Sequence, residues 1–398
     1  MNTHKQQTAT KNKPKTIGID GRCLLDENYT GVSEYTVALI KQLLKKHPDN
    51  KYTIFLNSFK GRDIQEKLLW LRKYKNVSLK HFYWPNKLLN FSLWFFRCPK
   101  LDKLIGGTDI FIAPNISFLG VSKQTKFILT IHDLSFERFK NTFSWKRRLW
   151  HFIINPRQLS RQADEIWTVS NSTKWDLESL YKIPGKKIKV KSIIQNLQAF
   201  KKGNIKQSKI KFIQKKYNLP NKFILYLGTI EPRKNIIKLV QAFEYLRKNK
   251  LINSDYKLVL AGQFGWKYGN ILKYINNSPC QSEIILPQFV EPKDKPYFYH
   301  LASVFVFPSL FEGFGIPVVE AMASGTPVIT SNNSSLPEVV NDAGILIDPD
   351  RTEDLIDALE LLLNSKTLRK EFHDKGLKRV VELERVSNSI KILTPLRF

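Results

Sequence analysis

A glycine-rich turn flanked by two glutamates holds the residues best suited to bind an anion or a sugar. It lies in the run Phe-Glu-Gly-Phe-Gly-Ile-Pro-Val-Val-Glu-Ala-Met-Ala-Ser-Gly at 311–325, shortly after a predicted strand at 304–307. Gly313 and Gly315 permit close approach of the backbone to a ligand, and Pro317 suits the first turn of a helix. The unpaired amide groups of such a turn form a site for an anion.

The two glutamates of this segment, Glu312 and Glu320, are eight residues apart. Carboxylates accept hydrogen bonds from neighbouring hydroxyl groups, which suits a sugar or a ribose. A purely structural explanation serves each residue alone, because Glu320 could complement a helix dipole and the glycines could only make a turn. The combination of the glutamate spacing, the Gly-x-Gly-x-Pro pattern and the position after a strand favours a ligand site.

A cationic pair, Arg233 and Lys234, lies in Leu-Gly-Thr-Ile-Glu-Pro-Arg-Lys-Asn at 227–235, between a predicted strand and a predicted helix. The pair could hold a diphosphate, the arginine through its planar fork and the lysine as a point charge. The alternative is an exposed basic pair in a chain with 64 lysine and arginine residues. The position between strand and helix favours the binding role.

Two positions in the first half of the chain could complete such a site. His132 ends a predicted strand, where it could contact a sugar, although a partly buried histidine with satisfied hydrogen bonds is as good an explanation. Gly31 precedes a predicted helix and could present backbone amides to a phosphate. A plain glycine turn capped by Ser33 explains the same residues.

The stretch Trp84–Arg97 is apolar nearly all round when it is drawn as a helix. Lys87, Arg97 and Lys100 flank it. Such a helix could contact a lipid-linked acceptor or the surface of an anionic membrane. A helix buried in the protein core is the alternative.

Short apolar runs alternate with helical periodicity along the chain and would position these residues. Strands are predicted at 16–20, 52–57, 77–82, 109–114, 126–132, 165–170, 223–228, 256–262, 284–289, 304–307, 327–330 and 345–347, and helices at 35–46, 235–248, 317–324 and 352–363. Strict alternation implies an α/β fold with parallel sheets covered on both faces. Two such sets predict two doubly wound Rossmann-like domains facing across a cleft, with ligands at the carboxyl ends of the strands.

The length of 398 residues also favours two domains over one. The stretch 198–221 is rich in lysine and glutamine and predicts the change of domain. We expect a disordered basic tail at 1–15, an N-terminal acceptor-side domain at 16–197, a C-terminal donor domain at 198–375, and a helix or tail at 376–398 that could be shortened.

The net charge of +29 lies mainly in the first half of the chain and favours anionic ligands or anionic lipid. A coding bias toward lysine is the alternative. The basic residues form no recognisable nucleic-acid module, so no nucleic-acid partner is expected. Three scattered cysteines and seven histidines outline neither a disulfide framework nor a metal site. No apolar run of ~18 residues and no secretory signal are visible, which predicts a cytoplasmic protein, with a peripheral position at the inner membrane face as an option.

Together these motifs resemble the retaining glycosyltransferases of glycosyltransferase family 4, whose GT-B architecture has two Rossmann-like domains. The resemblance runs from about Thr16 to about Leu363 and is most specific at 228–235 and 308–325. The stretch 86–109 and the run His-Asp-Leu-Ser-Phe-Glu-Arg-Phe resemble the mannosyltransferase-like branch that builds surface polysaccharides.

The resemblance implies roles for the residues of the glycine-rich turn. Glu312 matches the family glutamate that faces the transferred sugar, and Glu320 matches the one that holds the ribose hydroxyls. The backbone amides of Gly313, Phe314 and Gly315 match the loop that contacts phosphate and sugar.

The resemblance also assigns the remaining candidates. Arg233 and Lys234 match the pair that neutralises the diphosphate. His132 matches the histidine at the donor sugar, and Gly31 matches the glycine of the loop that approaches the phosphates.

The implied reaction is transfer of a hexose from a nucleotide diphosphate sugar to a hydroxyl of a glycan or lipid-linked acceptor, with retention at the anomeric carbon. Mannose from GDP-mannose is the best guess. Neither a divalent metal nor another cofactor is expected. Peripheral contact with an anionic membrane would suit a lipid-linked acceptor.

The sequence departs from the family pattern at three places. Ser33 and Glu34 stand where the family has glycine and arginine, and an acid beside an anionic ligand is unfavourable. Ile-Ile-Gln-Asn at 193–196 replaces a Pro-Asn-Gly segment, and the usual C-terminal Phe-Ser-Trp stretch is missing. These departures leave open a catalytically silent member of the fold that binds a nucleotide sugar or a glycan.

Overall fold

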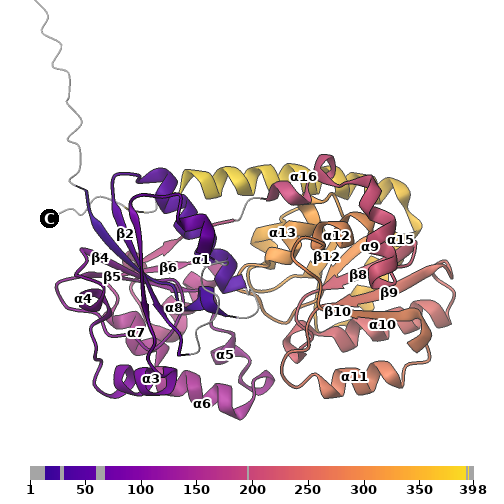
Figure 1. Ribbon diagram of the computed structural model, residues 1–398. Coiled ribbons are helices and arrows are strands. Elements are labelled where there is room, and N and C mark those ends of the chain that lie inside the picture. Colours follow the sequence, from indigo (N-terminus) through magenta and orange to yellow (C-terminus); the bar gives the residue numbers. More distant parts are fainter. Residues whose placement is uncertain (1–13, 27–30, 60–67, 195–196, 391–392, 394–398) are drawn as a thin grey trace, which may run out of the picture. The chain divides into compact units, whose positions relative to one another are not determined.

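The computed structural model describes residues 14–26, 31–59, 68–194, 197–390 and 393 (Figure 1). The tail predicted at 1–15 therefore lies almost wholly outside the described residues. The chain divides into two compact units. One comprises residues 1–130, 158–166 and 390–398, and the other comprises residues 131–157 and 167–389. The domain limits predicted from the sequence stay predictions.

Within the described chain, seven strands form one sheet in the order β3-β2-β1-β4-β5-β6-β7 (Figure 1). Strand β1 pairs in parallel with both β2 and β4, so the strand order reverses between β1 and β4. The strands are β1 (Thr16–Asp20), β2 (Lys51–Asn57), β3 (Val77–Phe82), β4 (Ile110–Ala113), β5 (Lys126–Ile131), β6 (Glu165–Thr168) and β7 (Ile188–Val190). The helices between them are α1 (Gly31–Lys46), α3 (Asn86–Phe95), α4 (Leu101–Leu104), α5 (Ser135–Arg138), α6 (Trp145–Ile154), α7 (Pro156–Gln162) and α8 (Asn171–Tyr181).

Six further strands of the described chain form a second sheet in the order β10-β9-β8-β11-β12-β13. Neighbouring strands of this sheet all pair in parallel, and the order reverses between β8 and β11. The strands are β8 (Lys222–Leu227), β9 (Tyr256–Ala261), β10 (Ile284–Gln288), β11 (Val304–Phe307), β12 (Val328–Ser331) and β13 (Ile345–Ile347). The helices are α9 (Gln207–Tyr217), α10 (Ile236–Lys248), α11 (Gly269–Asn276), α12 (Lys295–Leu301), α13 (Ile316–Ala323), α14 (Leu336–Val340), α15 (Thr352–Asn364) and α16 (Lys366–Ser389).

Short 3-10 turns link these elements. They are η1 (Arg22–Leu25), η2 (Leu69–Leu71), η3 (Lys140–Thr142), η4 (Gly185–Lys187), η5 (Leu197–Phe200), η6 (Lys202–Asn204), η7 (Pro232–Lys234) and η8 (Gln281–Glu283).

Both sheets are parallel with helices in the connections, and the prediction of two doubly wound Rossmann-like sheets is confirmed. Near-continuous apolar runs make the central strands, as in β4, where all four residues are buried. Every predicted strand is present with ends shifted by two residues or fewer. Strand β7 was missed, although Lys-Ile-Lys-Val-Lys at 187–191 alternates polar and apolar residues as a strand with one buried face does.

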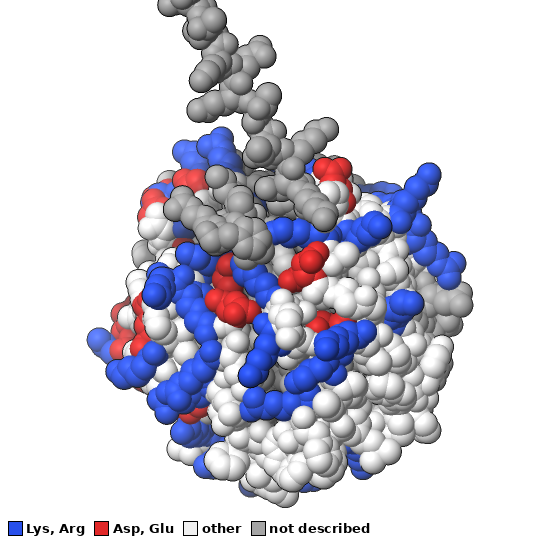
Figure 2. Space-filling model, turned by 90° about the vertical axis from the view of Figure 1, so that its left-hand side faces the viewer, with Lys and Arg blue, Asp and Glu red and all other residues white. Residues whose placement is uncertain are grey.

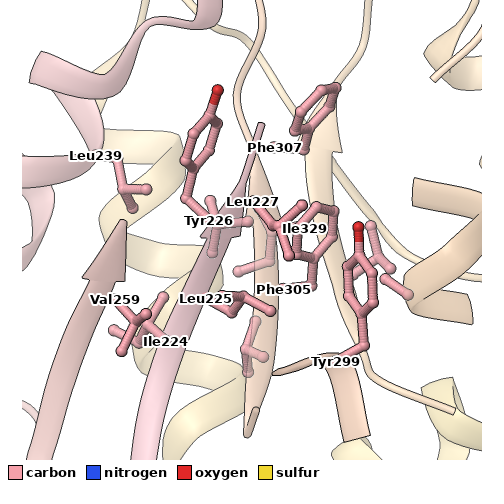
Figure 3. Close-up of a cluster of buried hydrophobic side chains, with 14 of the residues drawn as sticks. Ile224, Leu225, Tyr226, Leu227, Leu239, Val259, Tyr299, Phe305, Phe307 and Ile329 are labelled. Atoms are coloured by element: carbon pink, nitrogen blue, oxygen red, sulfur yellow. The ribbon is translucent and has the colours of Figure 1, made fainter. Parts of the chain in front are cut away.

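Aromatic rings pack around the central strands of the second sheet (Figure 3). The rings of Tyr226 in β8 and Phe307 in β11 stack with centroids 6.0 Å apart, and Phe305 lies 5.8 Å from Phe307. Tyr299 packs edge-on against Phe305 at 5.3 Å. The hydroxyl of Tyr226 donates to the carbonyl of Thr229 at 2.9 Å, so its buried polar group is satisfied. This core holds the carboxyl ends of β8 and β11 in place.

The C-terminal segment forms a long helix. Helix α16 has 24 residues and packs beside α13, where a side chain at the buried Gly376 would touch Met322. A ring nitrogen of His373 in α16 lies 2.6 Å from the carbonyl oxygen of Gly325. Among the described residues, no helix combines the length and the apolar character needed to span a bilayer.

Candidate functional site

Two loops of the second unit leave neighbouring strands at the switch point of the six-stranded sheet. The first follows β8 and leads through η7 to α10, and the second follows β11 and leads to α13. Because β8 and β11 are paired in parallel, both loops start at the same edge of the sheet. The amide of Leu310 donates to the carbonyl of Arg233 at 2.9 Å and ties the loops together. Ligands of open α/β sheets bind at such a point.

The first loop presents a cationic pair at the start of α10. The 3-10 turn η7 contains Arg233 and Lys234, and Asn235 then adopts a left-handed conformation with φ 57°. The side-chain amide of Asn235 donates to the carbonyl of Pro349 at 2.7 Å, which fixes this corner. Asparagine tolerates left-handed backbone better than most residues, so the sequence Arg-Lys-Asn fits the turn.

Four charged side chains from the two loops form one cluster. Lys234 Nζ lies 2.5 Å from Glu312 Oε1, and Arg233 Nη1 lies 3.4 Å from Glu312 Oε2. Arg233 also donates through Nε and Nη2 to Glu231 Oε1, at 3.2 and 2.9 Å. Two cations and two carboxylates make the cluster formally neutral. We call these four residues the ion cluster.

Burial and charge act together on the pKa values of the ion cluster. Burial alone would raise the pKa of Glu312, but attraction to Lys234 and Arg233 outweighs it and holds that pKa below its ordinary value. Burial, joined by repulsion from Arg233, lowers the pKa of Lys234. Burial also raises the pKa of Glu231, against the pull of Arg233 and Lys234. An anionic ligand would therefore meet two cations that are already held in place and largely dehydrated.

The second loop is held by serines ahead of α14 and by a glycine at the start of α13. The amide of Glu312 donates to Ser334 Oγ at 3.0 Å, and Ser335 Oγ donates to the carbonyl of Glu312 at 3.0 Å. Gly315 has φ 100° and receives the amides of Val318 and Val319 in the first turn of α13. These contacts fix the carboxylate of Glu312 toward the cationic pair.

The glycines of this loop are needed for different reasons. Gly315 lies in a backbone region that side chains avoid, and an added Cβ would lie 2.9 Å from Leu336 Cδ2. Gly313 leaves no room for a side chain, because an added Cβ would overlap the carbonyl oxygen of His132. Both residues belong to the same compact unit. The structure thus brings His132 beside the predicted loop.

Replacing Gly315 by alanine should lower the free energy of unfolding by about 1–3 kcal/mol, because the positive φ and the contact with Leu336 both oppose a side chain. Urea unfolding of the full chain measures this. Gly269→Ala is the matched control, since an added Cβ there meets no atom within 4 Å. Equal effects of the two substitutions would contradict the strain assigned to Gly315.

Glu320 belongs to a separate group of contacts. It lies in the middle of α13, buried, where Tyr299 Oη donates to its Oε2 at 2.7 Å and Lys295 Nζ lies 3.5 Å from its Oε1. Both partners come from α12. The structure therefore brings Glu312, Arg233 and Lys234 together and holds Glu320 apart from them.

Of the remaining candidates, His132 lies at the end of its predicted strand, whereas Gly31 lies in a helix and not in the predicted loop. His132 directly follows β5, and its carbonyl accepts from Thr173 Oγ1 at 2.9 Å. Gly31 is the first residue of α1, four residues before the predicted start of that helix, and it belongs to the other compact unit. Ser33 is buried and its hydroxyl donates to the carbonyl of Cys23 at 2.9 Å.

Metal ligands are not grouped in the described part of the chain, where no three His, Cys, Asp or Glu side chains could hold an ion together. The sequence Asp-Pro-Asp at 348–350 follows β13. Asp348 Oδ1 accepts the amide of Asp350 at 2.9 Å, as in a tight turn.

Sequence reasoning missed the partners that hold the predicted residues. Glu231 lies two positions before Arg233 in the same motif and could have been found as a carboxylate within reach of that guanidinium. Tyr299 and Lys295 reach Glu320 from 21 and 25 positions away, and nothing local in the sequence links them. Ser334 and Ser335 are likewise joined to Glu312 only by the fold.

Two family models match the chain. The model for Glycosyl transferases group 1 matches residues 207–379, and the model for Glycosyltransferase Family 4 matches residues 29–191. Both motifs of the ion cluster fall within the first of these ranges.

Curated relatives include mannosyltransferases of Escherichia coli. O-antigen chain mannosyltransferase B is 43% identical over 127 residues, which are 32% of this chain and 33% of that protein. Serotype-specific mannosyltransferase WbdA is 29% identical over 255 residues, which are 63% of this chain and 31% of that protein. The matched stretches thus span about a third of the length of these relatives.

Solved structures share the fold over nearly the whole chain. A glycosyltransferase from Rickettsia africae ESF-5 superposes with a TM-score of 0.67 at 18% identity, over 94% of this chain and 97% of that one. Anabaena HepE in complex with UDP and glucose superposes with a TM-score of 0.68 at 15% identity, over 96% of this chain and all of that one. The family matches on both halves of the sequence agree with the motifs and the fold, and the chain belongs to glycosyltransferase family 4, among relatives of the mannosyltransferase branch.

Proposed function

We propose that the chain is a retaining hexosyltransferase, with mannose from GDP-mannose as the first candidate for the transferred group. The acceptor is a hydroxyl of a glycan or of a lipid-linked sugar. The observation that carries this proposal is the ion cluster, in which Arg233 and Lys234 meet Glu312 at the carboxyl ends of β8 and β11. Curated mannosyltransferase relatives support a hexose, and HepE, solved with UDP-glucose, supports a nucleotide sugar as donor.

The chemical problem of the reaction is the charge of the leaving group. The bond between the anomeric carbon and the diphosphate oxygen breaks, and the bond to the acceptor oxygen forms on the same face of the sugar. The acceptor proton passes to the departing phosphate, so atoms and charge balance. Arg233 and Lys234 would stabilise the negative charge that grows on that phosphate, and fixed charges in a dehydrated site do this with little reorganisation.

The carboxylates would serve recognition rather than proton transfer. Glu312 faces the cationic pair and would meet hydroxyl groups of the donor sugar beside it. His132, whose carbonyl borders Gly313, would contact the same sugar. Glu320 would accept hydrogen bonds from the ribose, with Tyr299 and Lys295 fixing its orientation. The amides of Gly313, Phe314 and Gly315 would hold the phosphates.

We expect GDP-mannose to raise the melting temperature of the full chain more than UDP-glucose does, because a ligand that binds only the folded state stabilises it. Turnover of the stabilising donor should continue in excess EDTA. Proton NMR of the first product should show the donor's anomeric configuration. Loss of turnover in EDTA that added Mg²⁺ restores would contradict the metal-free reaction, and an inverted product would contradict retention.

A catalytically silent nucleotide-sugar or glycan-binding protein is the second candidate. The observation that favours it is Glu34, an acid in the first turn of α1, where the helix dipole would otherwise favour an anionic ligand. Donor binding without hydrolysis or transfer supports this candidate, and any donor turnover above the rate of the Arg233→Ala/Lys234→Ala variant excludes it.

A further inference from the structure

Helix α3 has two apolar faces, and only one of them is covered. Leu89 and Leu93 are buried against the rest of the unit. Leu88, Phe91 and Phe95, spaced i, i+3 and i+7, lie on the opposite side and are 67%, 53% and 66% exposed. The alternative prediction, a helix buried in the protein core, is therefore wrong for this outer face. A helix that is apolar all round is normally buried, so the exposed face needs an explanation.

The exposed rings continue past the end of the helix and form one cluster. Phe91 stacks on Phe95 with centroids 6.1 Å apart, and Trp94 and Phe96 meet Phe95 edge-on at 6.3 and 4.8 Å. We call Leu88, Phe91, Trp94, Phe95 and Phe96 the α3 aromatic face. Its four rings expose on the order of 450 Å², taking roughly 200 Å² per side chain, which is as large as the patches that mark interaction sites.

The surroundings of the α3 aromatic face are cationic. Between residues 83 and 104 the chain carries four basic residues and one acid; the basic ones are Lys87, Arg97, Lys100 and Lys103. The acid, Asp102, is buried and accepts hydrogen bonds from the amide of Ser122 and the hydroxyl of Thr125. Figure 2 shows one face of the molecule, where many lysine and arginine side chains lie beside a broad uncharged area.

Helix α6, which belongs to the other compact unit, has the same composition. Trp145, Leu149, Trp150 and Phe152 are exposed on it, and only Ile154 is buried. From 139 to 161 the sequence has six basic residues and no acid. An exposed aromatic surface with a cationic border thus occurs twice in one chain.

We propose that the α3 aromatic face docks on the surface of an anionic lipid bilayer. Tryptophan and phenylalanine insert favourably at the boundary of headgroups and acyl chains, while lysine and arginine bind anionic headgroups. A second copy of the chain fits less well, because a symmetric contact through this face would place its four cations against the same four cations. The proposal does not depend on the proposed reaction.

The test is flotation of the full chain with vesicles of phosphatidylcholine that contain about 30% phosphatidylglycerol, against vesicles of phosphatidylcholine alone. The chain should float with the anionic vesicles and much less with the neutral ones. Phe91→Gln/Phe95→Gln should lower the partition coefficient at least about ten-fold, because two inserted rings are lost. Lys87→Gln/Lys103→Gln should reduce binding to anionic vesicles and make it less sensitive to salt.

Phe212→Gln/Leu361→Gln is the matched control, since these side chains on α9 and α15 are 64% and 54% exposed and lie outside the proposed surface. Circular dichroism and the melting temperature confirm that each variant is folded. Equal flotation with both kinds of vesicle would overturn the proposal, and so would an equal loss in the control. If Phe91→Gln/Phe95→Gln leaves flotation unchanged but turns a dimer into a monomer by light scattering, the face is a subunit contact and the proposal fails.

Discussion

Replacing Arg233 and Lys234 together by alanine should lower kcat/KM for the donor by about a thousand-fold or more. Both side chains would stabilise the negative charge on the departing phosphate. Loss of one group that stabilises a developing anion lowers kcat by about a hundred- to a thousand-fold in known cases. A loss below about ten-fold, equivalent to ~1.4 kcal/mol, would be too small for the proposed role.

The chain contains its own control for this experiment. Helix α10 begins just after Arg233 and Lys234 and ends with the same dipeptide, Arg247 and Lys248. Arg247 also pairs with a carboxylate, Glu283, at 2.9 Å. The variant Arg247→Ala/Lys248→Ala removes the same charges from the far end of the same helix and should change kcat/KM less than three-fold. Comparable losses in both variants would assign the effect to net charge.

A conservative substitution of Arg233 separates the effect of its charge from the effect of its geometry. Arg233 uses Nε and Nη2 on Glu231 and Nη1 on the carbonyl of Phe311 and near Glu312, so three nitrogens of the guanidinium are occupied. Lysine at this position keeps the charge but cannot make this fork. We expect Arg233→Lys to fall between wild type and alanine in kcat/KM, with the melting temperature of the folded chain measured beside it.

The strands and the two loops of the site were predictable because their causes are local. Short apolar runs, which alternate with stretches of helical periodicity, predicted the ends of every strand of the second sheet to within two residues. The glycines and Pro317 gave the turn at the start of α13, since a positive φ at Gly315 and a helical first turn are properties of single residues. The charges of Glu312, Arg233 and Lys234 marked both loops as polar, and the ion cluster contains all three side chains.

The contacts that hold these residues could not be predicted, because they depend on which strands become neighbours. Arg233 and Glu312 are 79 positions apart and meet only because β8 pairs with β11. Tyr299 reaches Glu320 for the same kind of reason. The sequence left the exposure of α3 open, since a helix with apolar residues all round can face a membrane or lie in the core, and the structure shows that only Leu89 and Leu93 of this helix are buried.

Glu312→Gln is expected to affect both stability and activity. The substitution leaves Lys234 and Arg233 buried without this carboxylate, and breaking a buried ion pair on one side costs about 3–5 kcal/mol. Donor kcat/KM should fall about a hundred-fold or more, because the loss of the carboxylate also disturbs the orientation of Lys234. Glu291→Gln is the matched control, since Glu291 lies 2.5 Å from Lys216 Nζ, the same separation, but on the surface. That variant should keep the stability and the activity of the wild type.

The stability difference between wild type and Glu312→Gln should depend on pH in both directions. The pKa of Glu312 is held below its ordinary 4.5, so its ion pair contributes above that value and is lost as the pH falls through the lower folded pKa. The pKa of Lys234 is lowered by burial and by Arg233, and loss of Glu312 lowers it further. In the Glu312→Gln variant the buried, charged Lys234 lowers stability until rising pH removes its proton. The stability difference between the two proteins should therefore also shrink under alkaline conditions. Urea unfolding of both proteins from pH 2 to pH 10 measures it, and a difference that is flat across this range would mean that Glu312 and Lys234 do not form the buried pair on which the site depends.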